Sequence, residues 1–405
     1  GPSQISSFGS GADAKFIIPT GQRVLSIGNS SSQGFGDLAV YDIEMDGQLV
    51  TNTSAITGDG SYDQVTFLRV DVHDHTNGYT LSPSILDYWN NNGDPGHTIW
   101  DQWALIDTRQ NNINNGVEAG GFGGAYFGVS RFTFMGNDWD SNGGGEHTCR
   151  MPFVDRAVIS NSYLANPAST KHNLKLHCGN WATAGVSSGG KYSEKIVVSD
   201  NTFKGGTNAW PVNFAPQNDS SDERLRDIIC ERNYLLASSA TTVGIQTIGP
   251  VFYFTARNNI FNMSLATISQ ATGLNIGEGA HVGPAGTNHY AYNNTMYSSS
   301  TLNVRGVTYS SGIADTVIYN NLAYTPSSTT AVNLSGSAGT GFLSGTNSSD
   351  AQCRSTNPLF SSVPTTSATQ LSATDFKITT GSYGINGGTY QPVFEDFANV
   401  SRTGT

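Results

Sequence analysis

The sequence predicts an all-β, single-domain, right-handed parallel β-helix with long loops on one side. First, a strand-forming run that ends in Asn and an apolar residue recurs along the middle of the chain. Second, the intervals between these runs are unequal, which suits a coil that returns to the same place after each turn and extrudes loops of different length. Third, Gly, Asn and Ser are abundant, and these residues favour the left-handed conformations found at corners.

The repeated unit is clearest between residues 131 and 325. Strands of neighbouring coils lie about 4.8 Å apart, so a buried Asn at the same corner of each coil can hydrogen-bond to its neighbours as a ladder. The segment 132–137 extends the series backward. A β-sandwich or propeller would instead need hairpins with tight two-residue turns, which this sequence lacks. The asparagines expected at the shared corner are Asn161, Asn201, Asn233, Asn259, Asn294 and Asn321.

We expect the single domain to contain irregular N-terminal coils over 1–130, regular coils over 131–325, and irregular C-terminal coils and loops over 326–405. Segments 40–43 and 67–71 are candidates for early coils. Residues 82–90 are the best helical candidate, because a Ser-Pro pair opens them. The Ser/Thr/Gly-rich stretch 327–367 is typical of late coils and loops.

Composition excludes several function classes. The 405 residues carry 31 acidic and 20 basic side chains, for a net charge of −11, and such a field repels phosphate backbones, so we expect no nucleic-acid partner. No apolar run approaches the 18 or so residues of a membrane span. The four cysteines form no C-x-x-C pair, which argues against a zinc ribbon or thioredoxin-like site and leaves disulfides or buried thiols open.

The sequence favours a secreted, extracellular protein. Asn-x-Ser/Thr sequons recur along the chain, and Lys is scarce. The opening 1–3, Gly-Pro-Ser, looks like a protease scar, so the lack of a signal peptide is uninformative. The oligomeric state stays open.

Each coil should hold a further strand upstream of its Asn corner, and four of these are visible at 147–151, 172–177, 211–217 and 243–246. Side chains alternate between core and solvent along a strand. The residues expected to point inward are Cys149, Met151, Leu174, Leu176, Val212, Phe214 and Ile245. Those expected to point outward on one face are Arg150, Asn173, Lys175, His177, Asn213, Gln217 and Gln246. On this register Cys149 and Cys178 lie on neighbouring coils and close together.

The outward row brings scarce basic residues together with amides and imidazoles, which predicts a groove for an anionic sugar polymer. Glu146 and His147 follow a Gly-rich loop, and Trp181 and Trp210 flank the strands, where aromatic rings commonly stack on sugars. The alternative is an ordinary solvated face, with the tryptophans packed under loops.

These coils, across roughly 132–322, resemble the right-handed parallel β-helix superfamily of pectate lyases, chondroitinase-B-like and alginate lyases, and related glycoside hydrolases. The segments 172–177, 210–218 and 222–224 also resemble a group of uncharacterised secreted β-helix repeat proteins. In chondroitinase-B-like lyases a Lys acts as base and an Arg on an adjacent coil as acid, commonly with calcium. The resemblance implies these parts for Lys175 and Arg150, but here Arg precedes Lys, and the acidic calcium-binding cluster has no clear match. Any cofactor therefore stays open.

Three functions remain from the residues. A polysaccharide lyase acting on a uronate polymer by β-elimination needs a group that neutralises the carboxylate, a base, and an acid for the leaving oxygen. For these roles we predict Lys175, Arg150, His177 and His172. Around them we predict as substrate-binding residues Glu146, His147, Asn173, Trp181, Trp210, Asn213, Gln217 and Gln246.

The rival functions are a glycoside hydrolase, which needs two carboxylates roughly 5 to 9.5 Å apart, and a non-catalytic carbohydrate-binding β-helix. The hydrolase candidates are Glu146, Asp138, Asp140, Asp155 and Asp222.

Overall fold

The structure is a computed structural model of the 405-residue chain. It describes residues 3–7, 11–27, 35–50, 53–58, 62–81, 100–113, 125–140, 147–177, 192–206, 210–215, 224–239, 241–268, 271–278, 286–299, 304–310, 313–325, 332–336, 343–345, 357–365, 370–372 and 374–382.

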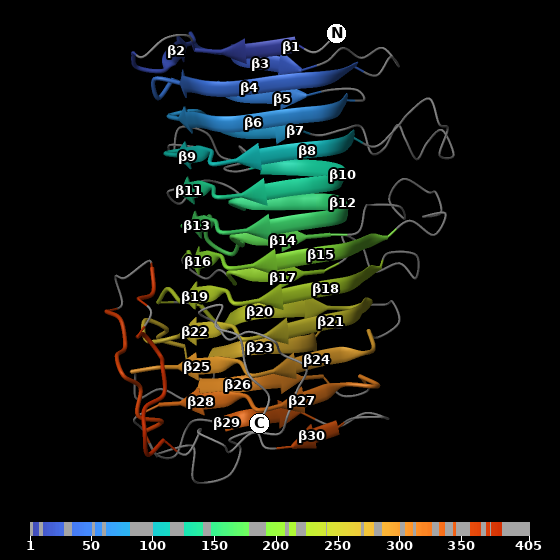
Figure 1. The fold of residues 1–405 in the computed structure, drawn as a ribbon, viewed down its shortest axis with the longest axis vertical. Coiled ribbons are helices and arrows are strands. Elements are labelled where there is room, and N and C mark those ends of the chain that lie inside the picture. The colour runs from blue at the N-terminus through green and yellow to red at the C-terminus, as the bar shows by residue number, and fades with distance from the viewer. Residues whose placement is uncertain are drawn as a thin grey trace.

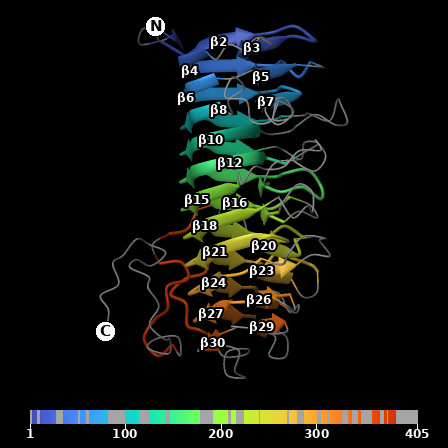
Figure 2. The same cartoon turned by 90° about the vertical axis from the view of Figure 1, so that its right-hand side faces the viewer.

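The described strands wind into a right-handed parallel β-helix, which confirms the predicted fold class (Figures 1 and 2). Every pairing between the named strands is parallel, and each strand pairs with its counterpart on the next coil, so three columns of strands run along the stack. The part of the chain that the structure describes contains no helix, and hence none that could span a membrane. The helix expected at 82–90 lies outside the described residues.

The first sheet is the column of longest strands. It consists of β1 (Ser3–Ser6), β4 (Phe35–Asp46), β6 (Tyr62–His73), β8 (Trp100–Ile106), β10 (Ala125–Met135), β12 (Cys149–Ser160), β15 (Ser193–Ser199), β18 (Leu225–Glu231), β21 (Val251–Arg257), β24 (His289–Tyr292), β27 (Val317–Tyr319) and β30 (Leu343–Gly345).

The second sheet follows the Asn corner, and the C-terminal ends of β4 and β6 join it. Its own strands are β2 (Ala14–Ile17), β9 (Arg109–Asn111), β11 (Asp138–Asp140), β13 (Tyr163–Ala165), β16 (Thr202–Lys204), β19 (Tyr234–Leu236), β22 (Ile260–Asn262), β25 (Thr295–Tyr297) and β28 (Leu322–Tyr324).

The third sheet closes the coil, and the N-terminal ends of β10 and β12 join it. Its own strands are β3 (Arg23–Ile27), β5 (Ser54–Gly58), β7 (Asn77–Leu81), β14 (Leu174–Leu176), β17 (Val212–Phe214), β20 (Val243–Ile248), β23 (Ala271–Glu278), β26 (Val304–Tyr309) and β29 (Val332–Gly336).

The core is a set of side-chain columns between the three sheets. Because parallel strands keep their register from coil to coil, one inward position of the first sheet produces an unbroken buried row. Aromatic rings fill the same interior nearby, where Tyr79 stacks on Trp139 at 5.1 Å between ring centroids. The buried row is Val40, Phe67, Leu105, Phe134, Ile159, Val198, Cys230, Ala256, Ala291 and Ile318.

The predicted asparagine ladder is present, with one change of register. The Oδ1 atom of Asn233 accepts hydrogen bonds from both the backbone N–H and the Nδ2 of Asn201, at 3.1 and 3.0 Å. The same pair of hydrogen bonds to one acceptor recurs between successive ladder residues on the following coils. The ladder residues are Asn201, Asn233, Asn259, Asn294 and Asn321, and Asn137 holds the same corner further up the stack.

The expectation for Asn161 is wrong. Asn161 is exposed and takes a left-handed conformation with φ of 50°, whereas the next residue, Ser162, occupies the corner and donates its backbone N–H to Asn201. On every ladder coil the residue before the corner is left-handed, as with Asp200 (φ 59°) and Asn258 (φ 54°). Asn161 fills that preceding place, because Asn is among the few non-Gly residues that adopt it readily.

A C-terminal segment within 357–382 packs across the outside of the second sheet. Phe376 is buried with Tyr234 and Ile260 of β19 and β22, and its ring also meets Tyr297 of β25 edge-on at 5.4 Å. This segment is the red strand-free stretch beside β19, β22 and β25 in Figure 1.

Candidate functional site

Arg150 and Lys175 are register partners on β12 and β14, so their Cα atoms lie one strand spacing apart, about 4.8 Å. Met151 and Leu176, their neighbours in sequence, are fully buried in the core. This alternation confirms that Arg150 and Lys175 point away from the core, where both are half-buried. Two adjacent cations in a chain of net charge −11 form a local positive site.

The amides of the predicted row continue this register. Asn213 of β17 pairs with Lys175, and Gln246 of β20 pairs with Asn213. The prediction that they lie open to solvent is wrong, since Asn213 is 0% and Gln246 1% exposed. Instead, Asn213 Nδ2 donates to Gln246 Oε1 at 3.4 Å. The two therefore form a short buried amide ladder below the cationic pair.

His177 also lies inside rather than on the open face. Its Nδ1 is 2.8 Å from the carbonyl oxygen of Ala215 on the next coil, and its Nε2 is 3.3 Å from Arg150 Nε. Because guanidinium nitrogens only donate, Nε2 must be the acceptor and Nδ1 must carry the proton. The expected outward base is thus a buried, neutral imidazole whose lone pair faces Arg150.

Three rings form a stacked column at the residues that immediately precede β12, β14 and β17. His147 stacks on His172 at 5.0 Å, and His172 stacks on Trp210 at 5.5 Å between ring centroids. The backbone N–H of His172 donates to His147 Nδ1, and His172 Nδ1 lies 2.8 Å from the carbonyl oxygen of Trp210. These contacts occupy the rings within the stack, and His172, which was predicted as a catalytic residue, is buried at 5% exposure.

Burial governs the charge of this column. Desolvation, with further contributions from His172, Lys175 and Arg150, holds the pKa of His147 well below its usual value. The same loss of solvent, with the charge of Lys175, lowers the pKa of His172 to about 3. Both imidazoles are therefore neutral near pH 7 and add no positive charge to that of Arg150 and Lys175.

Asn173 is buried and hydrogen-bonds to the backbone instead of facing solvent. Its Nδ2 donates to the backbone carbonyls of Leu164 and Lys204, both at 3.0 Å, and the side chain is fully buried. Asn173 lies at the bend before β14, where strict strand alternation does not apply, so its predicted outward orientation is wrong. Four other candidates lie outside the described residues: Glu146, Trp181, Gln217 and Asp222.

The described cysteines, Cys149 and Cys230, are buried free thiols. Burial raises the pKa of both, so both are protonated and inert. Cys178, the expected neighbour of Cys149, lies outside the described residues.

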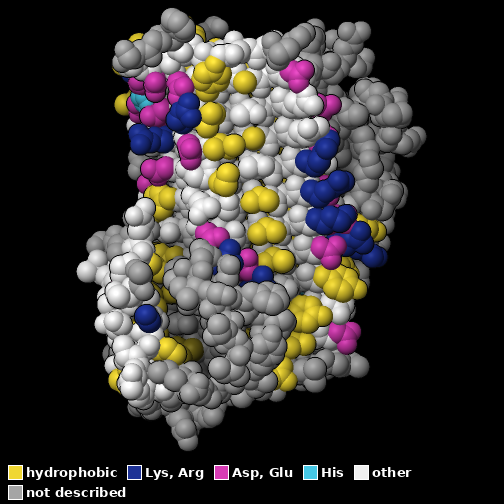
Figure 3. Space-filling model, viewed as in Figure 1, with side chains coloured by type: hydrophobic (Ala, Val, Ile, Leu, Met, Phe, Trp, Pro, Cys, Tyr) yellow, Lys and Arg dark blue, Asp and Glu magenta, His cyan; other side chains and the backbone are white. Residues whose placement is uncertain are grey.

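The remaining hydrolase candidates lie on other surfaces. Asp138 and Asp140 belong to β11 of the second sheet. Asp155 belongs to a column of charged residues that runs from coil to coil along the first sheet, and Arg156 contacts it at 3.0 Å. Figure 3 shows Lys and Arg side chains gathered with acidic ones in a column along one side of the stack. The further pairs of this column are Arg131–Asp101, Lys195–Glu194 and Arg226–Glu194.

One pair of carboxylates was missed by sequence reasoning. Asp63 of β6 and Asp101 of β8 are register partners, and Arg131 binds both oxygens of Asp101. Asp63 is half-buried, and desolvation raises its pKa, although the charge of Arg131 opposes this shift. No local motif marks either residue, because their proximity follows only from the strand register.

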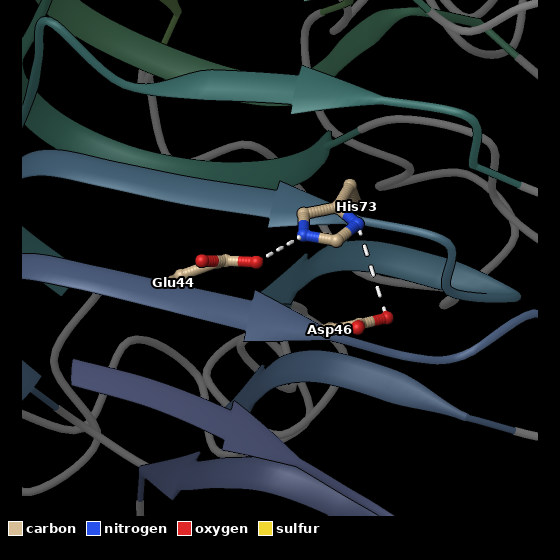
Figure 4. A group of neighbouring side chains, drawn as sticks. All are labelled: Glu44, Asp46 and His73. Atoms are coloured by element: carbon tan, nitrogen blue, oxygen red, sulfur yellow. Dashed lines mark hydrogen bonds and ion pairs between the residues drawn. The ribbon is translucent and has the colours of Figure 1, made fainter. Parts of the chain in front are cut away.

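A second cluster that sequence reasoning missed lies at the C-terminal ends of β4 and β6 (Figure 4). Ligand atoms of Glu44, Asp46 and His73 lie within 4.8 Å of one another, as in a metal site. These carboxylates already form ion pairs within the protein, since Lys15 Nζ bridges Glu44 and Asp46 at 2.7 and 2.8 Å. His73 bonds Glu44 through Nε2 at 2.9 Å and Asp74 through Nδ1 at 2.7 Å.

Both nitrogens of His73 must donate to these carboxylates, so the ring is an imidazolium. Accordingly, the hydrogen bonds to Asp74 and Glu44 raise the pKa of His73 against the opposing effect of desolvation. In the cluster of Lys15, Glu44, Asp46, His73 and Asp74, two cations therefore pair with three carboxylates and link neighbouring coils. Calcium also finds no fit beside Arg150 and Lys175, because the described residues there offer cations and imidazoles where that ion needs oxygen ligands.

No known protein family matches the sequence, and no curated protein matches it. Among solved structures the chain is similar to the tailspike protein of E. coli bacteriophage HK620 in complex with a pentasaccharide. With a point mutant of that tailspike it shares 11% identity at a TM-score of 0.44, covering 79% of this chain and 64% of the tailspike chain. With the unmutated tailspike the identity is 11% and the TM-score 0.40, covering 82% and 58%. The match thus spans less than two thirds of those chains.

Proposed function

We propose that this protein is a polysaccharide lyase that cleaves a uronate-containing polymer by β-elimination at the face formed by β12 and β14. The observation that carries the proposal is the register of Arg150 with Lys175, which puts two cations side by side in a strongly acidic protein. An anionic polymer is repelled by most of this surface and attracted to that point.

The chemistry can be assigned to these two residues. Arg150 binds the uronate carboxylate through its planar fork and stabilises the negative charge that develops as the C5 proton leaves. Lys175, in its unprotonated amine form, removes that proton, the C4–O bond breaks, and a double bond forms between C4 and C5. The proton on Lys175 then passes to the leaving oxygen, so the step needs no other reactant.

The test is to incubate the protein with a panel of acidic and neutral polysaccharides while following the ultraviolet absorbance of an unsaturated uronate. Absorbance should rise with one or more acidic polymers and with no neutral one. A saturated reducing end from an active preparation would contradict elimination, since hydrolysis creates no double bond.

Hydrolysis is a second candidate because of Asp63 and Asp101. The register puts the Cα atoms of the two residues one strand spacing apart, about 4.8 Å, and retaining glycosidases hold their two carboxyl groups about 5 to 5.5 Å apart. Their surroundings differ as an acid and a nucleophile require, since Asp63 is partly desolvated and Asp101 is paired with Arg131. Asp63→Asn should abolish a hydrolytic activity and leave an elimination activity unchanged.

We also propose that the protein acts outside the cell, which the recurrent sequons and the scarcity of Lys support. Finding the protein only inside the cells of its native source, and none in the medium, would contradict this.

A further inference from the structure

His177 is the middle of a hydrogen-bonded chain that crosses three coils. Arg150 Nε on β12 donates to His177 Nε2 beyond β14, and His177 Nδ1 donates to the carbonyl oxygen of Ala215 beyond β17. His177 is 3% exposed, so it cannot reach a polymer directly. We infer that His177 is a positioning residue that aims the guanidinium of Arg150 at a planar carboxylate, the ligand class that rests on the proposed function.

The edge that Arg150 presents to a ligand follows from the geometry of its guanidinium group. Arg carries five N–H donors in a rigid plane and can grip a carboxylate either through Nε and one terminal nitrogen or through both terminal nitrogens. The bond to His177 engages Nε and so selects the edge made by the two terminal nitrogens. That edge lies opposite His177, on the side away from the buried imidazole.

The anchor at Ala215 makes this orientation rigid. The carbonyl oxygen of Ala215 fixes the proton on Nδ1, and this leaves Nε2 as the acceptor that Arg150 requires. Among the described residues, the other charged or titratable groups that act on this site are Lys171, Lys175, His147 and His172. A ligand carboxylate then meets an arginine that is already oriented, so less conformational entropy is lost on binding.

Three variants separate positioning from general stability. His177→Phe keeps the ring volume and removes both hydrogen bonds. His177→Gln can still donate to Ala215 and accept from Arg150. His75→Phe is the matched control, because His75 is also fully buried and bonds a backbone carbonyl, that of Met45, at 3.2 Å in a distant coil.

The first readout is the dissociation constant for polygalacturonate, measured by calorimetry. Its fully methyl-esterified form, which lacks the carboxylate, is the control ligand. We expect His177→Phe to weaken binding of polygalacturonate about tenfold, as when one charge-assisted hydrogen bond is lost. His177→Gln should recover most of this loss, and His75→Phe should bind like the wild type. Equal affinity of wild type and His177→Phe, or an equal loss in His75→Phe, overturns the inference.

The second readout is the ¹⁵N spectrum of histidine-labelled protein without polymer. His177 should show a protonated Nδ1 and an unprotonated Nε2, and the Nε2 resonance should shift in Arg150→Ala. A proton on Nε2 overturns the inference. Polygalacturonate that binds in the expected His177-dependent manner without being cleaved would remove the elimination proposal alone, whereas a wild type that does not bind it overturns the carboxylate site itself.

Discussion

Asn233 makes two hydrogen bonds to a single atom, Asn259 Oδ1, one from its backbone N–H and one from Nδ2, both at 3.0 Å. Nδ2 also donates to the carbonyl oxygen of Val198 at 2.9 Å, so each ladder amide ties together three coils. Burial makes these bonds matter, since an unpaired polar group inside the stack has no water to replace its partner.

Asn233→Ala should therefore destabilise the fold strongly. The change removes the acceptor of the Asn201 backbone N–H and Nδ2 and the donor to the Val198 carbonyl oxygen, while the backbone N–H of residue 233 can still donate to Asn259 Oδ1. At about 1–3 kcal/mol for each buried group left unsatisfied, we expect a loss of about 3 kcal/mol or more, measured by denaturant unfolding. Asn161→Gly is the control: it is exposed and left-handed, and should change stability by less than about 0.5 kcal/mol. Similar losses in both variants would contradict the ladder assignment.

Lys175→Ala and Arg150→Ala should each nearly abolish elimination while leaving thermal unfolding little changed, because outward side chains add little to the core. Arg150→Lys should not rescue activity, since an ammonium cannot grip a carboxylate with two parallel bonds. Arg156→Ala, on the same strand β12 but paired with Asp155, is the matched control and should retain full activity. Initial rates of absorbance change decide the outcome, and an active Lys175→Ala would refute the role given to Lys175.

Stability should fall as the pH drops below about 6.5. Desolvation lowers the pKa of buried His75 to about 4 and that of His289 to about 4, and lowers those of His147 and His172 as well. Between those values and the unfolded pKa near 6.5, the unfolded chain binds more protons than the native one, so acid favours unfolding. We expect about 1–2 kcal/mol per histidine at pH 5.

His73 acts in the opposite sense. Its raised pKa adds stability that is present below pH 6.5 and lost as the pH rises through the folded value, but it is one histidine against four. His289→Phe, beside Phe254, should flatten the dependence of the unfolding temperature on pH. An unchanged slope in that variant would contradict the assignment of His289.

Chelators and added calcium or zinc should leave the unfolding temperature of the wild type unchanged. Lys15 and the His73 imidazolium already neutralise Glu44 and Asp46, so a metal ion would have to displace both. In Lys15→Ala the two carboxylates lose their bridging cation, and millimolar zinc should then raise the unfolding temperature. A shift of the wild type by zinc would show that this cluster is a metal site.

The sequence was sufficient for features that repeat on every coil and insufficient for those that depend on register. Inward Leu174 and Leu176 and the Asn ladder follow from local alternation and a shared corner, so they could be predicted. The proximity of Asp63 to Asp101 could not, because loops of unequal length separate the coils and hide which residues pair. Asn161 was misplaced by one residue for a related reason: its corner is a Ser, and Asn occurs at both the corner and the left-handed position before it.

The C-terminal segment changes how the later coils lose their structure. In a stack of coils each unit normally contacts only its neighbours, so unfolding can stop at any interface. Phe376 belongs to one buried cluster with Tyr234 and Ile260 and its ring contacts Tyr297. These residues belong to three successive coils, so the cluster adds a link that bypasses the nearest-neighbour contacts. Those three coils should exchange their amide hydrogens as one cooperative block, with protection set by the docking of the C-terminal segment through Phe360 and Phe376.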